Sequence, residues 1–278
     1  MATTTADIKA LREQTGAGML DVKKALDEAD GDRAKAIEIL RVKGLKGVTK
    51  REGRSASNGL VAAKVTGESG AQVGTLVEVN CETDFVAKGD RFIALAGQVL
   101  DLAVSSQAAD AESLLAAELD GKALKDVLDE ANATIGEKIE VRRVARLQAP
   151  LVASYLHRTS PDLPPQIGVL VALDTEDGDT ARDIAMHTAA MSPLHLTREE
   201  VSEETVANER RIAEDTAREE GKPEAALPRI VEGRVNGFFK DNVLLEQSFA
   251  KDPKRTVQQV LKDAGANATG FARFRVGA

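Results

Sequence analysis

The residues best suited to contact chemistry are Asp84 and Phe85, which stand together in the segment Asn80–Ala87, NCETDFVA. An apolar strand pattern at 75–79 precedes this segment and a helical pattern follows it, so we expect a strand-to-helix turn. Such a turn, held by a rigid scaffold, can carry a carboxylate and an aromatic ring outward as a charged and apolar wedge. Alternatively, Thr83 or Asp84 caps the next helix while Phe85 packs into the core. The local pattern alone favours this second alternative, because helix caps are common.

Covalent chemistry has little support in the sequence. Cys81 is the only cysteine, which excludes an intramolecular disulfide and a thiolate metal cluster. No histidine is near it in sequence, and a cysteine at a strand end is typically a small apolar filler. The segment 16–18, GAG, resembles the opening of a dinucleotide fingerprint, but Asp21 stands where a third glycine is needed. We therefore predict a protein that is not an enzyme, with no metal ligands and no cofactor of its own.

Composition limits the classes of partner. The chain has 278 residues with 42% apolar side chains, enough for a sizeable core in two or three modules. A formal net charge of −8 provides no global positive field, and 3% aromatic residues without tryptophan provide no stacking platform, so no direct nucleic-acid ligand is expected. Without a membrane-length apolar run or a signal-peptide pattern, we expect a soluble, cytoplasmic protein that does not contact a membrane.

Residues 1–46 have the pattern of three short helices. Thr4 can cap the first helix, a break at 15–18 separates it from the second, and Asp32 can cap the third. Gly44 is placed to end the third helix in a left-handed conformation. The basic segment that follows, residues 47–58, contains glycine and serine without apolar periodicity and is expected to be a linker.

The rest of the chain contains a weak internal repeat. Each copy has two strand patterns, a helical pattern and a closing strand. The ranges are 60–65, 75–79, 92–99 and 139–147 in the first copy, and 151–155, 168–173, 181–191 and 271–276 in the second. The predicted fold class is therefore α+β, with duplicated strand-strand-helix-strand core subdomains at 59–148 and 149–278.

A helical hairpin is expected inside the second copy, at about 197–243. Thr197 and Glu200 match a capping box that would begin a highly charged helix. Residues 221–223, GKP, reverse the chain, and a second helix follows in which Pro228 should delay or kink the start. Two polar helices joined by a tight turn predict a projecting coiled-coil hairpin.

Three longer motifs follow one another along the chain. They are LR, TGAGM and DVKKAL within 11–26, EVNCETDFVA at 78–87, and IAMHTAA at 184–190. Over essentially its whole length the sequence resembles the bacterial elongation factor Ts family, and the first two motifs are highly specific to it. The resemblance implies an N-terminal three-helix UBA-like bundle that binds the partner, and guanine-nucleotide exchange on elongation factor Tu in the cytoplasm.

The resemblance also implies a mechanism by displacement. The partner holds GDP and Mg²⁺, and the factor perturbs that site through an Asp-Phe wedge so that GDP leaves and GTP can bind. In this sequence the wedge residues are Thr83, Asp84, Phe85 and Val86. The family pattern allows a one-to-one complex or a dimer of heterodimers.

Further partner contacts are implied at positions that match the family. They are Arg12, Met19, Leu20, Lys23, Ile135, Gly136 and His157. His187 and His195 are expected to be structural, and Ala250 and Lys251 depart from the bulkier apolar residues that relatives use to touch another partner domain. The alternative function is a UBA-like protein-binding adaptor without exchange activity, which would explain the N-terminal bundle but not the duplicated core.

Overall fold

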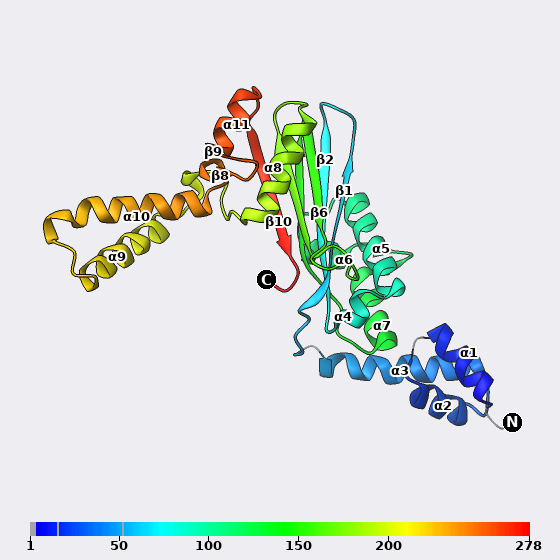
Figure 1. The fold of residues 1–278 in the computed structure, drawn as a ribbon. Coiled ribbons are helices and arrows are strands. Elements are labelled where there is room, and N and C mark those ends of the chain that lie inside the picture. Colours follow the sequence, from blue (N-terminus) through cyan, green and yellow to red (C-terminus); the bar gives the residue numbers. More distant parts are fainter. Residues whose placement is uncertain (1–3, 16, 52) are drawn as a thin grey trace.

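Three helices form a small bundle at one end of the molecule in the computed structural model (Figure 1). The structure describes residues 4–15, 17–51 and 53–278, with the backbone alone described at residue 13 and at 44–51. The helices are α1 (Thr5–Thr15), α2 (Met19–Glu28) and α3 (Arg33–Arg51). Their shared core consists of apolar side chains spaced at helical intervals: Leu11, Val22, Ala25, Leu26, Ala29 and Ala36.

Both caps predicted for this bundle are confirmed. Thr4 Oγ1 accepts the backbone N–H of Asp7 at 3.2 Å. Asp32 Oδ1 accepts the N–H groups of Ala34 at 2.9 Å and Lys35 at 3.2 Å. These bonds satisfy backbone donors that have no partner inside the helix, which is why short polar residues mark these helix starts.

The predicted end of the third helix is wrong. Helix α3 continues past Gly44 to Arg51, so the linker predicted at 47–58 is helical in its first part. A glycine inside a helix costs only about 1 kcal/mol, and the lysines and arginines of this segment are good helix formers. Helix α3 also lies along α7 (Leu124–Ile135), where Arg41 forms an ion pair with Glu130. This tertiary support favours a longer helix than the local sequence indicates.

Two three-stranded antiparallel sheets form the core and confirm the predicted α+β class. The strands of the first sheet, in spatial order, are β1 (Asn58–Thr66), β2 (Gln72–Cys81) and β5 (Glu140–Ala149). Those of the second sheet are β6 (Leu151–His157), β7 (Ile167–Leu173) and β10 (Ala268–Arg275). In both sheets the second strand of the repeat lies in the middle.

The two sheets pack face to face, with a glycine in each middle strand at the contact. A Cβ added to Gly74 would lie 3.1 Å from a methyl carbon of Leu170, and one added to Gly168 would lie 2.8 Å from a methyl carbon of Leu76. Each leucine stands two residues after the glycine of its own strand, so the contact is reciprocal. Only a residue without a side chain allows this close approach.

Helices cover the outer face of each sheet, so the core has four layers (Figure 1). The first sheet is covered by α5 (Asp90–Ser106), α6 (Ala111–Ala116) and α7; the second is covered by α8 (Gly178–Met191) and α11 (Val257–Asp263). Short two-residue and five-residue strands complete the chain: β3 (Glu118–Leu119), β4 (Lys122–Ala123), β8 (Ser248–Phe249) and β9 (Asp252–Thr256).

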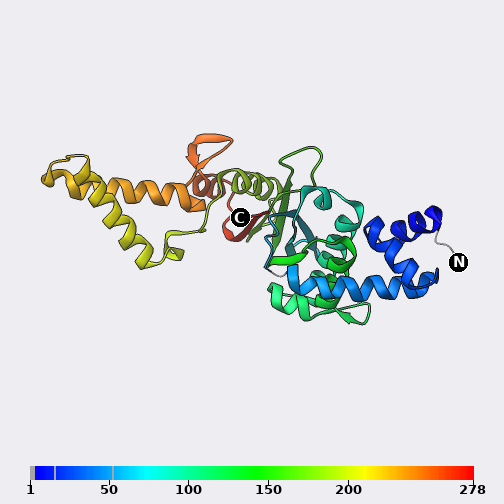
Figure 2. The same ribbon diagram turned by 90° about the horizontal axis from the view of Figure 1, so that it is seen from below.

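A hairpin of α9 (Glu203–Glu219) and α10 (Leu227–Asn242) projects from the second half. Figure 2 shows that this hairpin and the N-terminal bundle extend from opposite sides of the sheets. Pro228 lies in the first turn of α10, where a missing N–H costs no helical hydrogen bond, so the predicted delay or kink is wrong. None of the described helices combines the length and apolar composition needed to cross a bilayer.

The predicted capping box of this hairpin is also wrong. Helix α9 is capped by Ser202, whose Oγ accepts the N–H of Thr205 at 3.1 Å. Residues 198–200 form a separate 3₁₀ turn, and extended backbone at Val201 interrupts the helical path. The carboxylate of Glu200 accepts the N–H of Leu196 at 2.7 Å instead of completing a cap.

Candidate partner-binding site

The turn after β2 carries the predicted wedge on a short helix, α4 (Asp84–Ala87). Thr83 Oγ1 accepts the N–H of Val86 at 3.4 Å, which confirms the predicted cap. Phe85 is 76% exposed, so the alternative in which its ring packs into the core is wrong. The physical reason is the direction of α4: Ala87 is buried against the core, and Phe85 lies on the other side of the same helical turn.

A carboxylate from a distant segment holds this turn in place. Glu137 Oε2 accepts the backbone N–H of Thr83 at 3.0 Å, and Glu137 Oε1 accepts the Thr83 hydroxyl at 2.6 Å. Glu137 follows Gly136, which ends α7 with a φ of +89°, a conformation that favours glycine. The structure therefore places the predicted contact residues Ile135 and Gly136 next to the wedge.

The Asp84 carboxylate and the Phe85 ring are only weakly engaged within the chain. Lys88 Nζ lies 3.2 Å from Asp84 Oδ2 and 4.8 Å from the centre of the Phe85 ring. An exposed ion pair of this kind contributes about 0 to 1 kcal/mol. A partner that offers Asp84 a better-oriented donor can therefore displace Lys88 at little cost.

Cys81, just before the turn, is a buried filler. Its thiol donates to the carbonyl oxygen of Thr83 at 3.2 Å. Burial, and then the negative charge of Glu137, raise the pKa of the Cys81 thiol to about 12. The nucleophilic thiolate is thus suppressed at neutral pH, as the prediction of a structural cysteine requires.

The predicted contact residues of the N-terminal bundle form a separate exposed surface. Met19 is 54% exposed and Leu20 is 72% exposed, and both lie at the start of α2. Arg12 at the end of α1 and Lys23 on α2 are exposed too. Adjacent large apolar side chains cannot both face a narrow helical core stripe, and here neither does.

His157 belongs to the second sheet, at the end of β6. Its side chain is exposed, and its Nδ1 lies 3.3 Å from the hydroxyl of Tyr155. The site residues predicted from the sequence thus divide into three groups: the wedge with the end of α7, the N-terminal bundle, and His157. In the first group, Glu137, the residue after Gly136, connects the end of α7 to Thr83 by two hydrogen bonds.

The other two histidines have structural positions, as predicted. His187 of α8 is buried: its Nδ1 accepts the N–H of Ala250 at 3.1 Å, and its Nε2 therefore carries the proton donated to Gln247 Oε1 at 2.9 Å. Burial lowers the pKa of His187, while the hydrogen bond with Gln247 acts in the opposite direction. His195 forms an isolated bridge with Val243 at the base of the hairpin.

Glu137 and Lys88 contact the predicted wedge and were missed by sequence reasoning. Lys88 could have been found from its spacing, because a cation four residues after Asp84 lies on the same helix face. Glu137 could not, since 54 positions separate it from Thr83. Its only signal is the neighbouring glycine, which indicates a helix end but no partner.

Comparison with known proteins agrees with this architecture. The model of the family described as Elongation factor TS matches residues 82–278. The elongation factors Ts of Beutenbergia cavernae and Micrococcus luteus are each 65% identical to the chain over 277 residues, covering 99% of this chain and 99% and 98% of theirs. That of Kineococcus radiotolerans is 64% identical over 277 residues, covering 100% of this chain and 99% of its own.

These matches define the class of protein as an α+β factor of translation elongation. The relatives span almost the full length of the chain, including the N-terminal bundle that precedes the family match. The chain belongs to the elongation factor Ts family.

Proposed function

We propose that this protein is a guanine-nucleotide exchange factor for elongation factor Tu and that Asp84 and Phe85 form its wedge. The observation that carries the proposal is the 76% exposed ring of Phe85 on a turn that is capped by Thr83 and held by Glu137. A large aromatic side chain on a rigid support is the usual anchor of a protein interface. Rigidity reduces the ordering cost of binding, so more of the contact energy is available to act on the partner.

The proposed mechanism is displacement rather than covalent catalysis. Phe85 enters an apolar cleft of the partner's nucleotide-binding domain, and Asp84 exchanges Lys88 for a polar group of the partner. The resulting shift weakens the Mg²⁺ and phosphate contacts that hold GDP in the partner. Because the two equilibria are linked, GDP must weaken binding of the factor by the same ratio, and the overall GDP/GTP equilibrium is unchanged.

The remaining predicted residues are proposed as accessory contacts. Ile135 and Gly136 extend the wedge surface, His157 contributes from the second sheet, and the bundle at 1–46 adds a separate partner-binding domain. Its exposed Met19 and Leu20 suit an apolar groove on the partner. These two side chains also favour the alternative function, a UBA-like adaptor that binds without promoting exchange.

Release of fluorescent GDP from elongation factor Tu of the same organism, in excess unlabelled GDP, tests the proposal. We expect saturable acceleration by the protein and a loss of about 30-fold or more in exchange efficiency for Phe85→Ala, since truncating an interface anchor costs about 2 kcal/mol or more. Leu194→Ala is the matched control, because Leu194 is a similarly exposed apolar side chain, 68%, away from the wedge.

The outcomes separate the alternatives. Full activity of a folded Phe85→Ala variant would contradict the wedge, whereas binding without acceleration by the unmodified protein would favour the adaptor. Equal losses for Phe85→Ala and Leu194→Ala would show that general apolar exposure, rather than the wedge, determines activity.

A further inference from the structure

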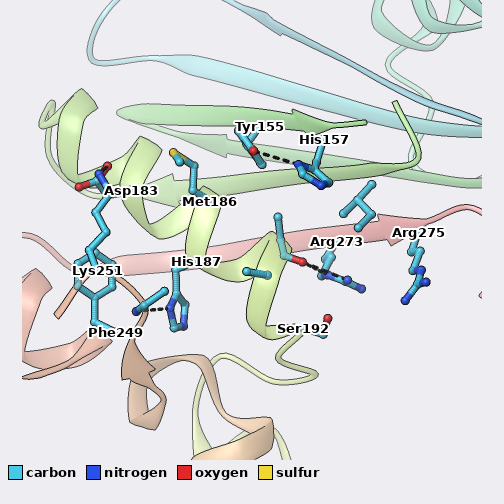
Figure 3. A pocket seen from close by; sticks show the side chains of 14 residues that line it. Tyr155, His157, Asp183, Met186, His187, Ser192, Phe249, Lys251, Arg273 and Arg275 are labelled. Carbon is cyan, nitrogen blue, oxygen red and sulfur yellow. Dashed lines mark hydrogen bonds and ion pairs between the residues drawn. The ribbon is translucent and has the colours of Figure 1, made fainter. Parts of the chain in front are cut away.

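A cavity of about 460 Å³ lies in the second half of the molecule, away from the wedge. Figure 3 shows it bordered by strands β6 and β10, helix α8 and the β8 segment. Its volume falls within the range of about 300 to 1,000 Å³ that is usual for small-molecule sites, which combine apolar walls with a few convergent polar groups. The apolar wall here includes Ile167, Met186 and Phe249.

Two arginines supply the polar end of this cavity. Arg273 and Arg275 are two residues apart on β10, so their side chains leave the same face of the sheet. In Figure 3 they lie at one end, with His157 across from them, while Lys251 and Asp183 lie at the other end. The latter two residues already neutralise each other, with Lys251 Nζ 2.5 Å from Asp183 Oδ1.

The charges of the two arginines are not compensated within the described part of the chain. Arg273 donates through Nε and Nη2 to the carbonyl oxygen of Ala189, at 3.3 and 3.2 Å, and Nη1 is left available. Neither Arg273 nor Arg275 has an ion pair with a described carboxylate. The nearby Arg143, by contrast, pairs with the buried Glu78 at 2.6 Å.

Both arginines carry their charge at one end of the cavity, in a chain of net charge −8. Burial lowers the pKa of Arg273, and the positive charges of Arg275 and then Arg143 lower it further. Like charges held together in a partly dry site are unfavourable, and a bound anion would relieve the repulsion. The hydrogen bonds to the carbonyl oxygen of Ala189 explain the position of Arg273. They do not involve the side chain of Arg275.

We propose that this cavity binds a small anionic ligand, whose phosphate or carboxylate group pairs with Arg273 and Arg275 and whose apolar part lies against Met186 and Phe249. A guanidinium group presents a planar fork of donors that matches either oxyanion. The hydroxyl of Ser192 and the ring of His157 border the same end and can add hydrogen bonds. The site lies away from Asp84 and Phe85, and it shares His157 with the accessory partner contacts of the proposed function.

Calorimetric titration of the full-length protein with phenyl phosphate and with benzoate tests the site. Each probe joins an oxyanion to an apolar ring, and phenol serves as the uncharged comparison. We expect saturable binding of at least one anionic probe, little binding of phenol, and affinity weakened about tenfold or more in Arg275→Gln, because a charge-assisted hydrogen bond is lost. Arg142→Gln, an equal charge change at an exposed position of β5 outside the cavity, should retain affinity.

The relative affinities of phenyl phosphate and benzoate identify the anionic group of the ligand. Preference for phenyl phosphate indicates a phosphate ester, and preference for benzoate indicates a carboxylate. The proposal is overturned if folded protein binds neither anion at millimolar concentrations, or if Arg275→Gln, shown to be folded by circular dichroism, binds as tightly as the unmodified protein. Since elongation factor Tu is absent from this measurement, either result is independent of the exchange assay.

Discussion

The two halves of the core share one plan but differ in the turn that follows the middle strand. In the first half, a four-residue helix, α4, is inserted between β2 and α5 and exposes Phe85. In the second half, Asp177 follows β7 closely and caps α8, accepting the N–H of Thr180 at 3.0 Å. One inserted helical turn is enough to change an ordinary helix start into a projecting surface.

The second half also differs in the hydrogen bonds of its turn, because the carboxylate that follows β7 is bonded within the chain. Asp174 accepts the backbone N–H of Asn267 at 2.7 Å and its side-chain amide at 2.8 Å. These bonds hold the carboxylate of Asp174 to the chain before β10, whereas the carboxylate of Asp84 in the first half bonds to the exposed Lys88. The turn after the middle strand thus exposes Phe85 in the first half and is bonded to the chain before β10 in the second half.

The largest effect on stability is expected from substitutions at the contact between the two sheets. They test whether both sheets contribute equally to this contact. Gly74→Ala and Gly168→Ala should each lower the free energy of unfolding by about 1 to 3 kcal/mol, because the new Cβ overpacks the contact between the sheets. Urea unfolding followed by circular dichroism measures the loss. The double variant should lose less than the sum, since the two sites share neighbours.

Gly97→Ala is the matched control for these glycines. Nothing lies within 4 Å of a Cβ at this helical position, so the substitution should raise stability by about 0.5 to 1 kcal/mol. A cost at Gly74 but none at Gly168 would show that the two sheets do not contribute equally to their contact.

The N-caps of the two halves, Thr83 of α4 and Asp177 of α8, can be compared by removing each side chain. Thr83→Ala and Asp177→Ala should each cost about 1 kcal/mol of stability, the usual effect of removing an N-cap. Only Thr83→Ala should slow GDP release, because it also removes the hydroxyl bonded to Glu137. Parallel unfolding and exchange measurements would contradict the proposed wedge if both variants slowed release equally.

Acid should weaken the second half selectively. Burial lowers the pKa of His187 below its usual 6.5, so the unfolded chain binds more protons when the pH falls below that value. Neutral His187 therefore makes its full contribution to stability above about pH 6.5. Below that pH the free energy of unfolding falls by about 1.4 kcal/mol per pH unit, until the pH reaches the pKa of His187 in the folded protein. Protonation also removes the acceptor for the N–H of Ala250.

Hydrogen exchange at about pH 7 and about pH 5.5 locates this effect. Amides around α8 and the β8 segment should lose protection before those around α5, since the first half contains no histidine. His187→Gln should be less stable at neutral pH but less sensitive to acid. An unchanged pH dependence in this variant would assign the acid sensitivity to another group.

Several elements were predictable because their causes are local. Thr4 and Asp32 begin helices through bonds to residues two or three positions away, and the alternating strands of the repeat reflect a period of two. The error at Gly44 has the opposite origin, whereas the error at Glu200 arises from a competing local bond. Helix α3 is supported by the distant helix α7, which outweighs the local signal at Gly44. The carboxylate of Glu200 accepts the N–H of Leu196, four positions away, instead of the N–H of Thr197 that a capping box requires.

The sequence by itself determined the α+β plan and the family, and it predicted the repeat and the wedge residues, since these depend on short-range patterns and ordered motifs. Tertiary structure alone decided that Phe85 faces outward, because its position depends on the packing of Ala87 and on a hydrogen bond between residues 54 positions apart. It also decided that Arg273 and Arg275 meet His157 at one cavity. Exposure and charge surplus are properties of contacts between distant segments, which no local pattern encodes.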